Sequence, residues 1–253
     1  MPDPAILGVI ADLDGVVYRG ETAIATAVEA LARWREAGVP ACYVTNNATR
    51  TPEAFAEKLT AMGVPTEPRG VITSPVATAA YIRERWPNGA DVFVVGAPAL
   101  AAAMEEVGCR VVTKGAAEVV VVGLDRSFTY EKLLMAAQAV LGGAVLIGTN
   151  ADPQLPVEGT FEPGAGSILA AIATASRATP TVIGKPEPRM IAMALERLGT
   201  PKGSTVMIGD QTSTDIVAGQ RAGLRSILVT TGVPVDTVTA TPDRIVDSLL
   251  ELF

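Results

Sequence analysis

Short apolar runs, rich in β-branched residues, alternate along the chain with longer stretches rich in alanine and leucine. A short continuous apolar run predicts a strand buried on both faces, whereas the longer stretches, such as Ala23–Glu36 and Ile191–Leu198, predict helices. Strands and helices that alternate in this way predict a parallel sheet covered by helices. The predicted strands are Gly8–Ala11, Ala41–Thr45, Val71–Ser74, Val92–Val95, Arg110–Val112, Val119–Val122, Val145–Ile147, Thr181–Ile183, Thr205–Ile208 and Ser226–Val229.

Polar clusters follow directly after four of these strands, which bears on the domain organisation. Because ligands of open α/β sheets bind at the carboxyl ends of strands, the four clusters are expected to converge on one site. The middle third has strands and helices of its own but lacks a comparable set of charges. We therefore predict a Rossmann-like, doubly wound α/β core from residues 1–78 and 180–253, with an inserted α/β cap domain at 79–179.

Charge and composition narrow the function classes. The formal net charge of the chain is −7, so electrostatic binding to nucleic acid or to an anionic membrane is not expected. An anionic small substrate would need a local cluster of donors or a metal ion. The chain contains no histidine, which excludes Ser-His-Asp and Cys-His catalysis and histidine metal sites. Any acid, base or nucleophile must therefore be a carboxylate, a lysine, a tyrosine, a cysteine or a hydroxyl group.

The two cysteines and the start of the chain bear on location. Cys42 and Cys109 are too few and too far apart in sequence for a disulfide framework or a zinc site, and we expect both to be buried thiols. The chain begins without a basic segment or a signal-like apolar stretch, and no apolar run approaches the ~20 residues that span a bilayer. A cytoplasmic protein without a membrane partner is expected.

The first polar cluster pairs two carboxylates. Asp12 and Asp14 follow the apolar run Gly8–Ala11. Two unpaired charges 4 Å apart repel by ~4 kcal/mol at an effective dielectric constant of 20, and a cation between them, or a proton on one, removes this cost. The alternative interpretation is a solvated acidic turn.

The other three clusters carry groups suited to phosphate or to a hard cation. Thr45–Asn47 offers a hydroxyl, amides and backbone N–H groups as a neutral anion cradle, although an ordinary strand-to-helix turn fits as well. Lys185, between a glycine and a proline, offers a point charge to phosphate, but most single lysines lie on the surface. Asp210 and Asp215 follow a predicted buried strand and suit an oxygen-rich site for a divalent cation.

In this order and spacing the clusters resemble the four motifs of the haloacid dehalogenase superfamily, along essentially the whole chain. The matching segments are Asp12–Gly15, Val44–Asn47, Gly184–Pro186 and Gly209–Asp215. The long middle insertion, with Thr149–Asp152 followed by Pro163–Ser167, resembles the type IIA, nitrophenyl phosphatase-like subgroup, which has a large α/β cap. The resemblance implies a hydrolase that removes phosphate from a small phosphorylated metabolite with the help of Mg²⁺.

The resemblance also implies a role for each matching residue. Asp12 would be the nucleophile and a magnesium ligand. Asp14 would protonate the leaving oxygen and then deprotonate water, while its backbone carbonyl binds the metal. Three residues would hold the phosphoryl oxygens: Thr45, Asn46 and Lys185. Asp210 would be the remaining protein ligand of the metal, and two residues would support the site: Asp215 and Asn47.

The sequence leaves the substrate open. Members of the resembling subgroup act on phosphoglycolate, glycerol phosphate, sugar phosphates, nucleotides, pyridoxal phosphate or nitrophenyl phosphate. The segment 152–158 follows a predicted cap strand, and its two prolines are expected to present Gln154 and Leu155 to the leaving group. The resemblance is compatible with a homodimer formed through the caps. A phosphomutase of the same superfamily and a non-catalytic module that binds phosphometabolites are the alternatives.

Overall fold

Strands from both ends of the chain pair into one six-stranded sheet in the order β15-β14-β13-β1-β4-β5. The pairs β13–β14, β14–β15, β1–β13 and β1–β4 are parallel. The strands are β1 (Gly8–Ala11), β4 (Ala41–Thr45), β5 (Val71–Thr73), β13 (Thr205–Gly209), β14 (Arg225–Val229) and β15 (Arg244–Val246). All four residues of β1 are buried, so the first strand made lies at the centre of the sheet. This parallel sheet confirms the predicted α/β class.

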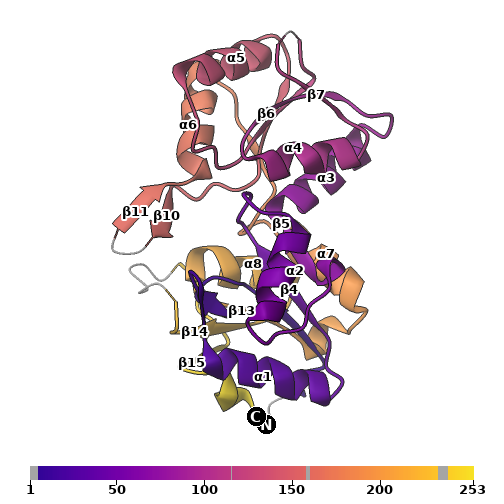
Figure 1. The fold of residues 1–253 in the computed structure, drawn as a ribbon, viewed down its shortest axis with the longest axis vertical. Helices are drawn as coiled ribbons and strands as arrows, with labels where there is room; N and C mark the ends of the chain where they lie inside the picture. Colours follow the sequence, from indigo (N-terminus) through magenta and orange to yellow (C-terminus); the bar gives the residue numbers. More distant parts are fainter. Residues whose placement is uncertain (1–4, 115, 158–159, 233–238) are drawn as a thin grey trace. The chain divides into compact units, whose positions relative to one another are not determined.

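The structure is a computed structural model that describes residues 5–114, 116–157, 160–232 and 239–253 (Figure 1). The chain divides into two compact units. The first comprises Met1–Thr45, Pro52–Ile72 and Lys185–Phe253, and the second comprises Asn46–Thr51 and Thr73–Gly184. The second unit is thus inserted into the chain of the first. That residues 79–179 serve as a lid stays a prediction.

The helices of the first unit follow from local sequence signals. α2 begins at Pro52, whose fixed φ angle suits the first helical position, and Glu53 follows in the first turn. α7 ends at Gly199, which adopts a φ of 65° that an L-residue with a side chain rarely takes. The helices are α1 (Ala25–Glu36), α2 (Pro52–Ala61), α7 (Arg189–Leu198) and α8 (Val217–Ala222), with short 3₁₀ turns at Pro68–Gly70, Lys202–Ser204 and Leu249–Leu252 and a π-helical turn at Thr212–Ile216.

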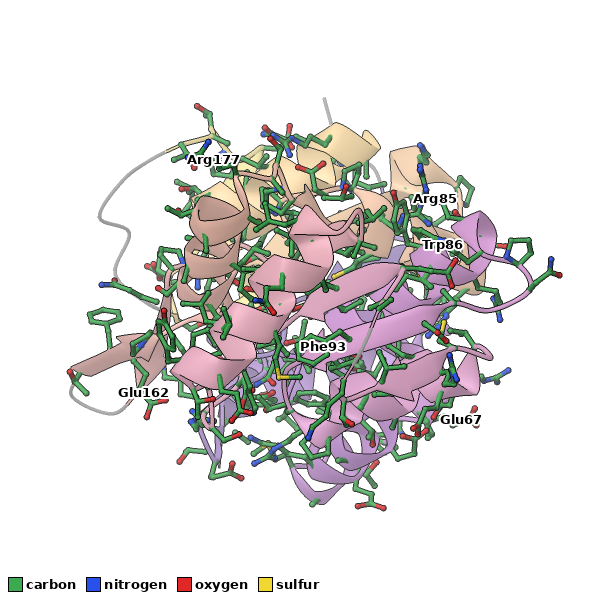
Figure 2. All side chains as sticks on the ribbon, turned by 90° about the horizontal axis from the view of Figure 1, so that it is seen from above. Glu67, Arg85, Trp86, Phe93, Glu162 and Arg177 are labelled. Carbon is green, nitrogen blue, oxygen red and sulfur yellow. The ribbon has the colours of Figure 1, made fainter. Side chains whose placement is uncertain are left out.

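The second unit is built around its own parallel sheet, in the order β12-β9-β8-β6-β7. Its central strand β8 is four buried valines, and Phe93 of β6 packs into the core beside it (Figure 2). The strands are β6 (Asp91–Val95), β7 (Arg110–Val112), β8 (Val119–Val122), β9 (Val145–Gly148) and β12 (Thr181–Val182). The helices are α3 (Ser74–Arg85), α4 (Pro98–Glu106), α5 (Tyr130–Leu141) and α6 (Ala165–Ser176). Within the described residues, none of the helices combines the length and the apolar character that a bilayer span requires.

Two hairpins depart from the sequence-based expectation. The segment 152–158, which was not among the predicted strands, contains β10 (Gln154–Val157). This strand pairs antiparallel with β11 (Thr160–Pro163), and the last residue of the segment, Glu158, lies outside the described residues. The hairpin β2 (Tyr18–Arg19) and β3 (Thr22–Ala23) was not predicted either. Isolated two-stranded ribbons tolerate proline and show little apolar periodicity. The sequences of these two hairpins therefore lack the signals from which strands are predicted.

Candidate active site

Two carboxylates emerge side by side at the carboxyl edge of the first unit's sheet. Asp12 follows β1 directly and Asp210 follows β13 directly. Because these strands pair in parallel with Ala11 opposite Ile208, both acids leave the sheet at the same edge. Their side chains are almost fully buried, with Asp12 8% and Asp210 2% exposed. The sheet register therefore concentrates negative charge at one place.

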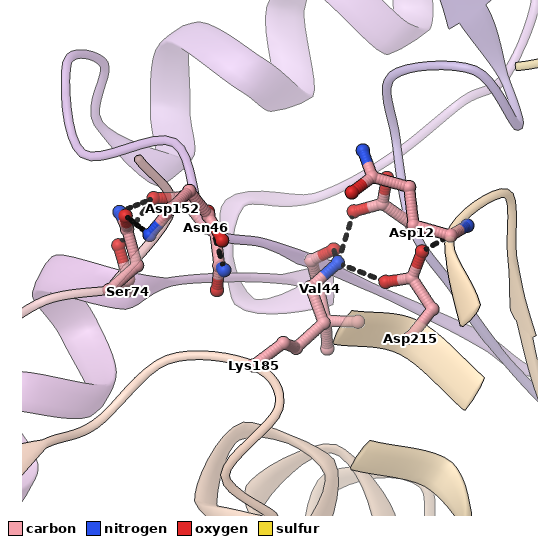
Figure 3. A network of polar contacts seen from close by, with 9 residues as sticks. Asp12, Val44, Asn46, Ser74, Asp152, Lys185 and Asp215 are labelled. Atoms are coloured by element: carbon pink, nitrogen blue, oxygen red, sulfur yellow. Dashed lines mark hydrogen bonds and ion pairs between the residues drawn. The ribbon is translucent and has the colours of Figure 1, made fainter. Parts of the chain in front are cut away.

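A buried lysine joins this edge. Lys185 is 3% exposed, and its Nζ donates to Asp12 Oδ1 at 2.5 Å and to Asp215 Oδ1 at 2.6 Å (Figure 3). The same ammonium lies 3.4 Å from the backbone carbonyl oxygen of Val44, near the end of β4. The second carboxylate oxygen of Asp215 accepts from the backbone N–H of Gln211 at 3.1 Å. The structure thus brings together Asp12, Lys185 and Asp215, which are far apart in the sequence.

Burial and neighbouring charges change the ionisation of these groups. Burial raises the pKa of Asp12 to about 7, with Asp215 adding to the effect and Lys185 opposing it. Burial alone would lower the pKa of Lys185, but the adjacent Asp12 and Asp215 carboxylates outweigh it and raise that pKa. Lys185 therefore stays a cation, and the Asp12 carboxylate needs further positive charge to be fully ionised at neutral pH.

The buried carboxylates fit a divalent cation. One oxygen from each of Asp12, Asp210 and Asp215 lies within 4.8 Å of the others, and all three residues are buried. The Lys185 ammonium pairs with two of these carboxylates, Asp12 and Asp215, so one positive charge is set against three acids and the cluster has an excess of negative charge. Such an excess is costly in a buried site unless a cation compensates it. Carboxylate oxygens are the ligands that Mg²⁺ prefers, and the donor set therefore fits this ion.

Two glycines leave the room that the Asp210 carboxylate occupies. A Cβ on Gly15 would lie 2.3 Å from Asp210 Oδ2, and a Cβ on Gly232 would lie 1.9 Å from the same atom and 2.3 Å from Asp210 Cβ. Gly15 also has a φ of 78°. Because the Cβ of Asp210 is itself in the way at Gly232, rotating the carboxylate cannot relieve the overlap. Asp210 is thus held between two backbone segments.

Gly232→Ala is expected to weaken metal binding at least about tenfold, because a displaced Asp210 loses its place in the ligand set. Titration calorimetry with MgCl₂ and MnCl₂ measures this directly, without reliance on turnover. Gly203→Ala is the matched control, since a Cβ at Gly203 meets no atom within 4 Å. Equal metal affinity in Gly232→Ala and wild type would show that Asp210 does not need this space.

Asp14 lies apart from the buried cluster, on the loop that leads into the β2–β3 hairpin. Its side chain is exposed, and its backbone forms an isolated bridge with Tyr18. Partial desolvation raises the pKa of Asp14, while the nearby Lys58 and the backbone N–H groups of Gly20 and Gly15 oppose the rise. A solvent-accessible carboxyl with a raised pKa suits proton exchange with a leaving group or with water.

The predicted phosphate-binding segment is divided between the units. Thr45 ends β4 in the first unit and is 6% exposed, whereas Asn46 and Asn47 belong to the second unit. The Asn46 carboxamide donates to Asp152 Oδ2 at 2.9 Å, and its backbone oxygen accepts from Ser74 Oγ at 2.7 Å (Figure 3). These bonds fix Asn46 firmly within its own unit.

Asn47 is exposed, and its Oδ1 accepts from the backbone N–H of Thr49 at 2.9 Å and from Thr49 Oγ1 at 2.7 Å. This bonding closes a local turn of the kind that asparagine favours. Its predicted supporting role, and the phosphate-binding roles of Thr45 and Asn46, stay predictions.

The predicted specificity residues lie on a hairpin of the second unit. Gln154 and Leu155 are on β10. Glu162, on the partner strand β11 (Figure 2), accepts from Arg126 Nη2 at 2.6 Å. The role of Gln154 and Leu155 in substrate selection stays a prediction. A cavity of about 300 Å³ lies instead at the amino-terminal end of β4 in the first unit, and none of the three buried carboxylates lines it.

Sequence reasoning missed several residues that lie beside predicted site residues, among them Asp152 and Lys58. Asp152 was noted only as part of a resembling segment, yet it accepts from Asn46. Lys58 was passed over, although it lies near Asp14. A signal for Lys58 was available: it is three residues after Phe55 and next to Leu59, hence on the apolar face of α2, where a charge is unusual.

Comparison with known proteins agrees with this geometry. A family model described as haloacid dehalogenase-like hydrolase matches residues 9–110, and a related hydrolase model of the same type matches residues 182–252. An acid sugar phosphatase of Staphylococcus aureus is 42% identical over 222 residues, which covers 88% of this chain and 85% of the relative. The chain belongs to the haloacid dehalogenase-like hydrolases. The resemblance inferred from the four motifs is therefore confirmed.

Solved structures of this hydrolase family share the whole fold. A double mutant of a thermostable nitrophenyl phosphatase from Geobacillus stearothermophilus is 40% identical, with a TM-score of 0.90 and 98% coverage of both chains. A p-nitrophenyl phosphatase from Archaeoglobus fulgidus is 31% identical, with a TM-score of 0.92 and the same coverage. The haloacid dehalogenase-like hydrolase described here thus has the architecture of the nitrophenyl phosphatase-like members, as the sequence predicted.

Proposed function

We propose that this hydrolase is a Mg²⁺-dependent phosphatase that cleaves a small phosphate monoester through an aspartyl-phosphate intermediate on Asp12. The observation that carries the proposal is the buried cluster in which Lys185 bonds both Asp12 and Asp215 beside Asp210. A non-catalytic phosphate-binding module would gain nothing from burying three carboxylates, since they repel a phosphate. A carboxylate nucleophile with a bound cation gives that arrangement a purpose.

The reaction follows from the chemistry of the side chains. An Asp12 carboxylate oxygen forms a bond to phosphorus while the bond from phosphorus to the leaving oxygen breaks, and Asp14 donates a proton to that oxygen. Asp14, now ionised, takes a proton from water, whose oxygen attacks phosphorus and releases inorganic phosphate and the free Asp12 carboxylate. Lys185 offsets the negative charge that builds up when an anion approaches Asp12.

Mg²⁺ is proposed to be held by Asp12, Asp210 and the backbone carbonyl of Asp14, where it would supply charge neutralisation for the phosphoryl group. Asp215 is proposed to support the site by orienting Lys185. Thr45 and Asn46 are proposed to hold phosphoryl oxygens, with Asn47 shaping their loop. The specificity residues Gln154 and Leu155 would contact the leaving group, and a homodimer through the second unit is compatible with this arrangement.

Removal of the metal is expected to abolish phosphate release, and Mg²⁺ is expected to restore it. Ca²⁺ is expected to bind but to support little turnover. It accepts longer bonds and more ligands than Mg²⁺, so the Asp12 carboxylate would be poorly oriented for attack on phosphorus. Phosphate release after exhaustive chelation, followed by addition of MgCl₂ or CaCl₂, measures both effects. Full activity in the chelated protein would overturn the metal requirement.

The names of the relatives suggest where to look for the substrate. The Staphylococcus aureus relative is named for sugar phosphates, and the structural relatives are named for nitrophenyl phosphate. We propose a sugar phosphate as the physiological substrate class and nitrophenyl phosphate as a convenient synthetic substrate. The test is a phosphate-release screen with Mg²⁺ over sugar phosphates, glycerol phosphate, phosphoglycolate, nucleotides and pyridoxal phosphate. Product analysis in the same screen separates hydrolysis from phosphate migration within the substrate.

A further inference from the structure

A lysine is buried on the apolar face of helix α2. The Lys58 side chain is only 11% exposed, and it lies among the buried positions Phe55, Ala56 and Leu59 of the same helix. Placing an ammonium group in such a position is costly unless the group is paired and hydrogen-bonded. A fully exposed lysine needs no such partners, because water solvates its ammonium group. The partners of the Lys58 ammonium therefore indicate its role.

All the described partners of the Lys58 ammonium lie in or beside the β2–β3 hairpin. Its Nζ donates to the backbone carbonyl of Gly20 at 2.6 Å and to Glu21 Oε1 at 3.1 Å. The same atom lies 4.0 Å from the centroid of the Tyr18 ring, within the range of a cation–π contact. The Glu21 side chain is largely exposed, so water screens its charge and its ion pair with Lys58 is weak. The main partners of the Lys58 ammonium are therefore the Gly20 carbonyl and the Tyr18 ring. Lys58 therefore fastens the hairpin turn to α2.

The β2–β3 hairpin is also bonded to the loop that carries Asp14. The backbone of Asp14 forms an isolated bridge with Tyr18, and the Gly20 carbonyl at the hairpin turn accepts from Lys58. The backbone N–H of Gly15 also donates to the carbonyl of Tyr18 at 2.7 Å, which ties the Asp14 loop to β2. Gly20 has a φ of 55°, a conformation in which a side chain would strain the turn. Lys58 thus holds the hairpin through the Gly20 carbonyl and the Tyr18 ring, and the backbone of Tyr18 is paired with the Asp14 loop.

We propose that Lys58 is a positioning residue that fixes the β2–β3 hairpin and thereby holds the Asp14 loop in place for proton transfer. This inference rests on the proposed function, in which Asp14 protonates the leaving group. An exposed carboxyl rotates freely unless bonds hold it, and a small misplacement of a catalytic group is enough to slow proton transfer. Lys58 touches neither the substrate nor the buried carboxylates in this scheme, and the hydrogen bonds that it makes are with the hairpin turn.

The test compares two aryl phosphates of nearly equal size, phenyl phosphate and 4-nitrophenyl phosphate, by their kcat/KM values. This parameter reports the first phosphoryl transfer, in which the leaving group departs. Phenol is the poorer leaving group and needs the proton more. Lys58→Met is expected to lower kcat/KM for phenyl phosphate about 10- to 100-fold and for 4-nitrophenyl phosphate less than about threefold. Lys58→Arg, which keeps a charged N–H donor, is expected to restore most of the difference.

Lys202→Met is the matched control, because Lys202 also donates to a backbone carbonyl, that of Ala222 at 3.0 Å, but outside the hairpin. The ratio of the two kcat/KM values should be unchanged in this control. A loss in Lys58→Met that is equal for both substrates, or no loss, overturns the proposal and leaves Lys58 a structural anchor. If Lys58→Met does not fold, Lys58→Gln replaces it with the same outcomes, since its shorter side chain ends before the Gly20 carbonyl.

Asp14→Asn, measured beside these variants, distinguishes a failure of the proposed acid role of Asp14 from a failure of the positioning role of Lys58. If Asp14→Asn keeps the wild-type preference between the two aryl phosphates, the proposed role of Asp14 fails, and the role of Lys58 fails with it. If Asp14→Asn loses phenyl phosphate turnover selectively but Lys58→Met does not, the proposed function stands and only the positioning role of Lys58 is wrong.

Discussion

Replacing Asp12 with asparagine is expected to reduce turnover by at least about 10⁴-fold while the protein stays folded. An amide is a very poor nucleophile towards phosphorus, so the covalent route is lost, and removal of a catalytic nucleophile has effects of this size or larger. Phosphate release under saturating Mg²⁺ measures the loss, with mass spectrometry to verify that the amide has not reverted to aspartate. Asp91→Asn is the control, because Asp91 pairs with Arg110 on the surface of the second unit.

The same variant separates loss of function from loss of fold. Burial raises the pKa of Asp12 from 3.8 to about 7, so ionisation is less favourable in the folded chain than in the unfolded one. The metal-free wild type therefore loses stability as the pH rises from about 4 to about 7, and Asp12→Asn does not. The variant is therefore expected to be more stable than the metal-free wild type above pH 7, less any bonding that Lys185 loses.

Denaturant unfolding at pH 5 and pH 8 in the presence of a chelator measures this difference. The free energy of unfolding of Asp12→Asn should exceed that of wild type at pH 8, and the excess should shrink at pH 5. A variant that is less stable than wild type at pH 8 would mean that the Asp12–Lys185 bond stabilises the fold more than burial of the charge destabilises it.

Asp14→Asn is expected to lower the rate of the first phosphoryl transfer about 10²- to 10⁴-fold for an alkyl phosphate, and much less for nitrophenyl phosphate. The reason is that an alkoxide leaves only when it is protonated, whereas a nitrophenolate leaves without much help. Rapid-mixing kinetics with both substrates resolve this step from hydrolysis of the intermediate. Losses of equal size for both substrates would assign the proton transfer to another group.

The core strands could be predicted from the sequence because they are buried on both faces. β1, β4, β7 and β8 have the predicted bounds, and the other predicted strands differ by a residue at an end. A parallel strand inside an α/β unit reads as a continuous apolar run, so its sequence signal is strong. β15 was missed because two of its three residues are exposed and the run Arg244–Val246 is short and begins with a charge.

The site was predictable where a polar residue follows such a strand, and less so elsewhere. Asp12, Asp210 and Lys185 were singled out from their positions after strands, and the structure joins Lys185 to Asp12. Lys58 lies in the middle of a helix, and its importance depends on a hairpin of two-residue strands that leaves little trace in the sequence. Gly232 was equally hidden, because its closeness to Asp210 arises only when the chain is folded.

The pairing of β1 with β13 has a consequence for the order in which the protein is made. Gly8 leaves the ribosome long before its partner Thr205, because the whole second unit is encoded between them. Until Thr205 is made, one edge of the buried strand β1 has no neighbour, which exposes a template for pairing with other chains. A nascent chain that stops before Thr205 also lacks Asp210 and Asp215, so two of the three buried carboxylates are added only after the second unit has been made. The second unit, encoded in one nearly continuous stretch, has no such delay.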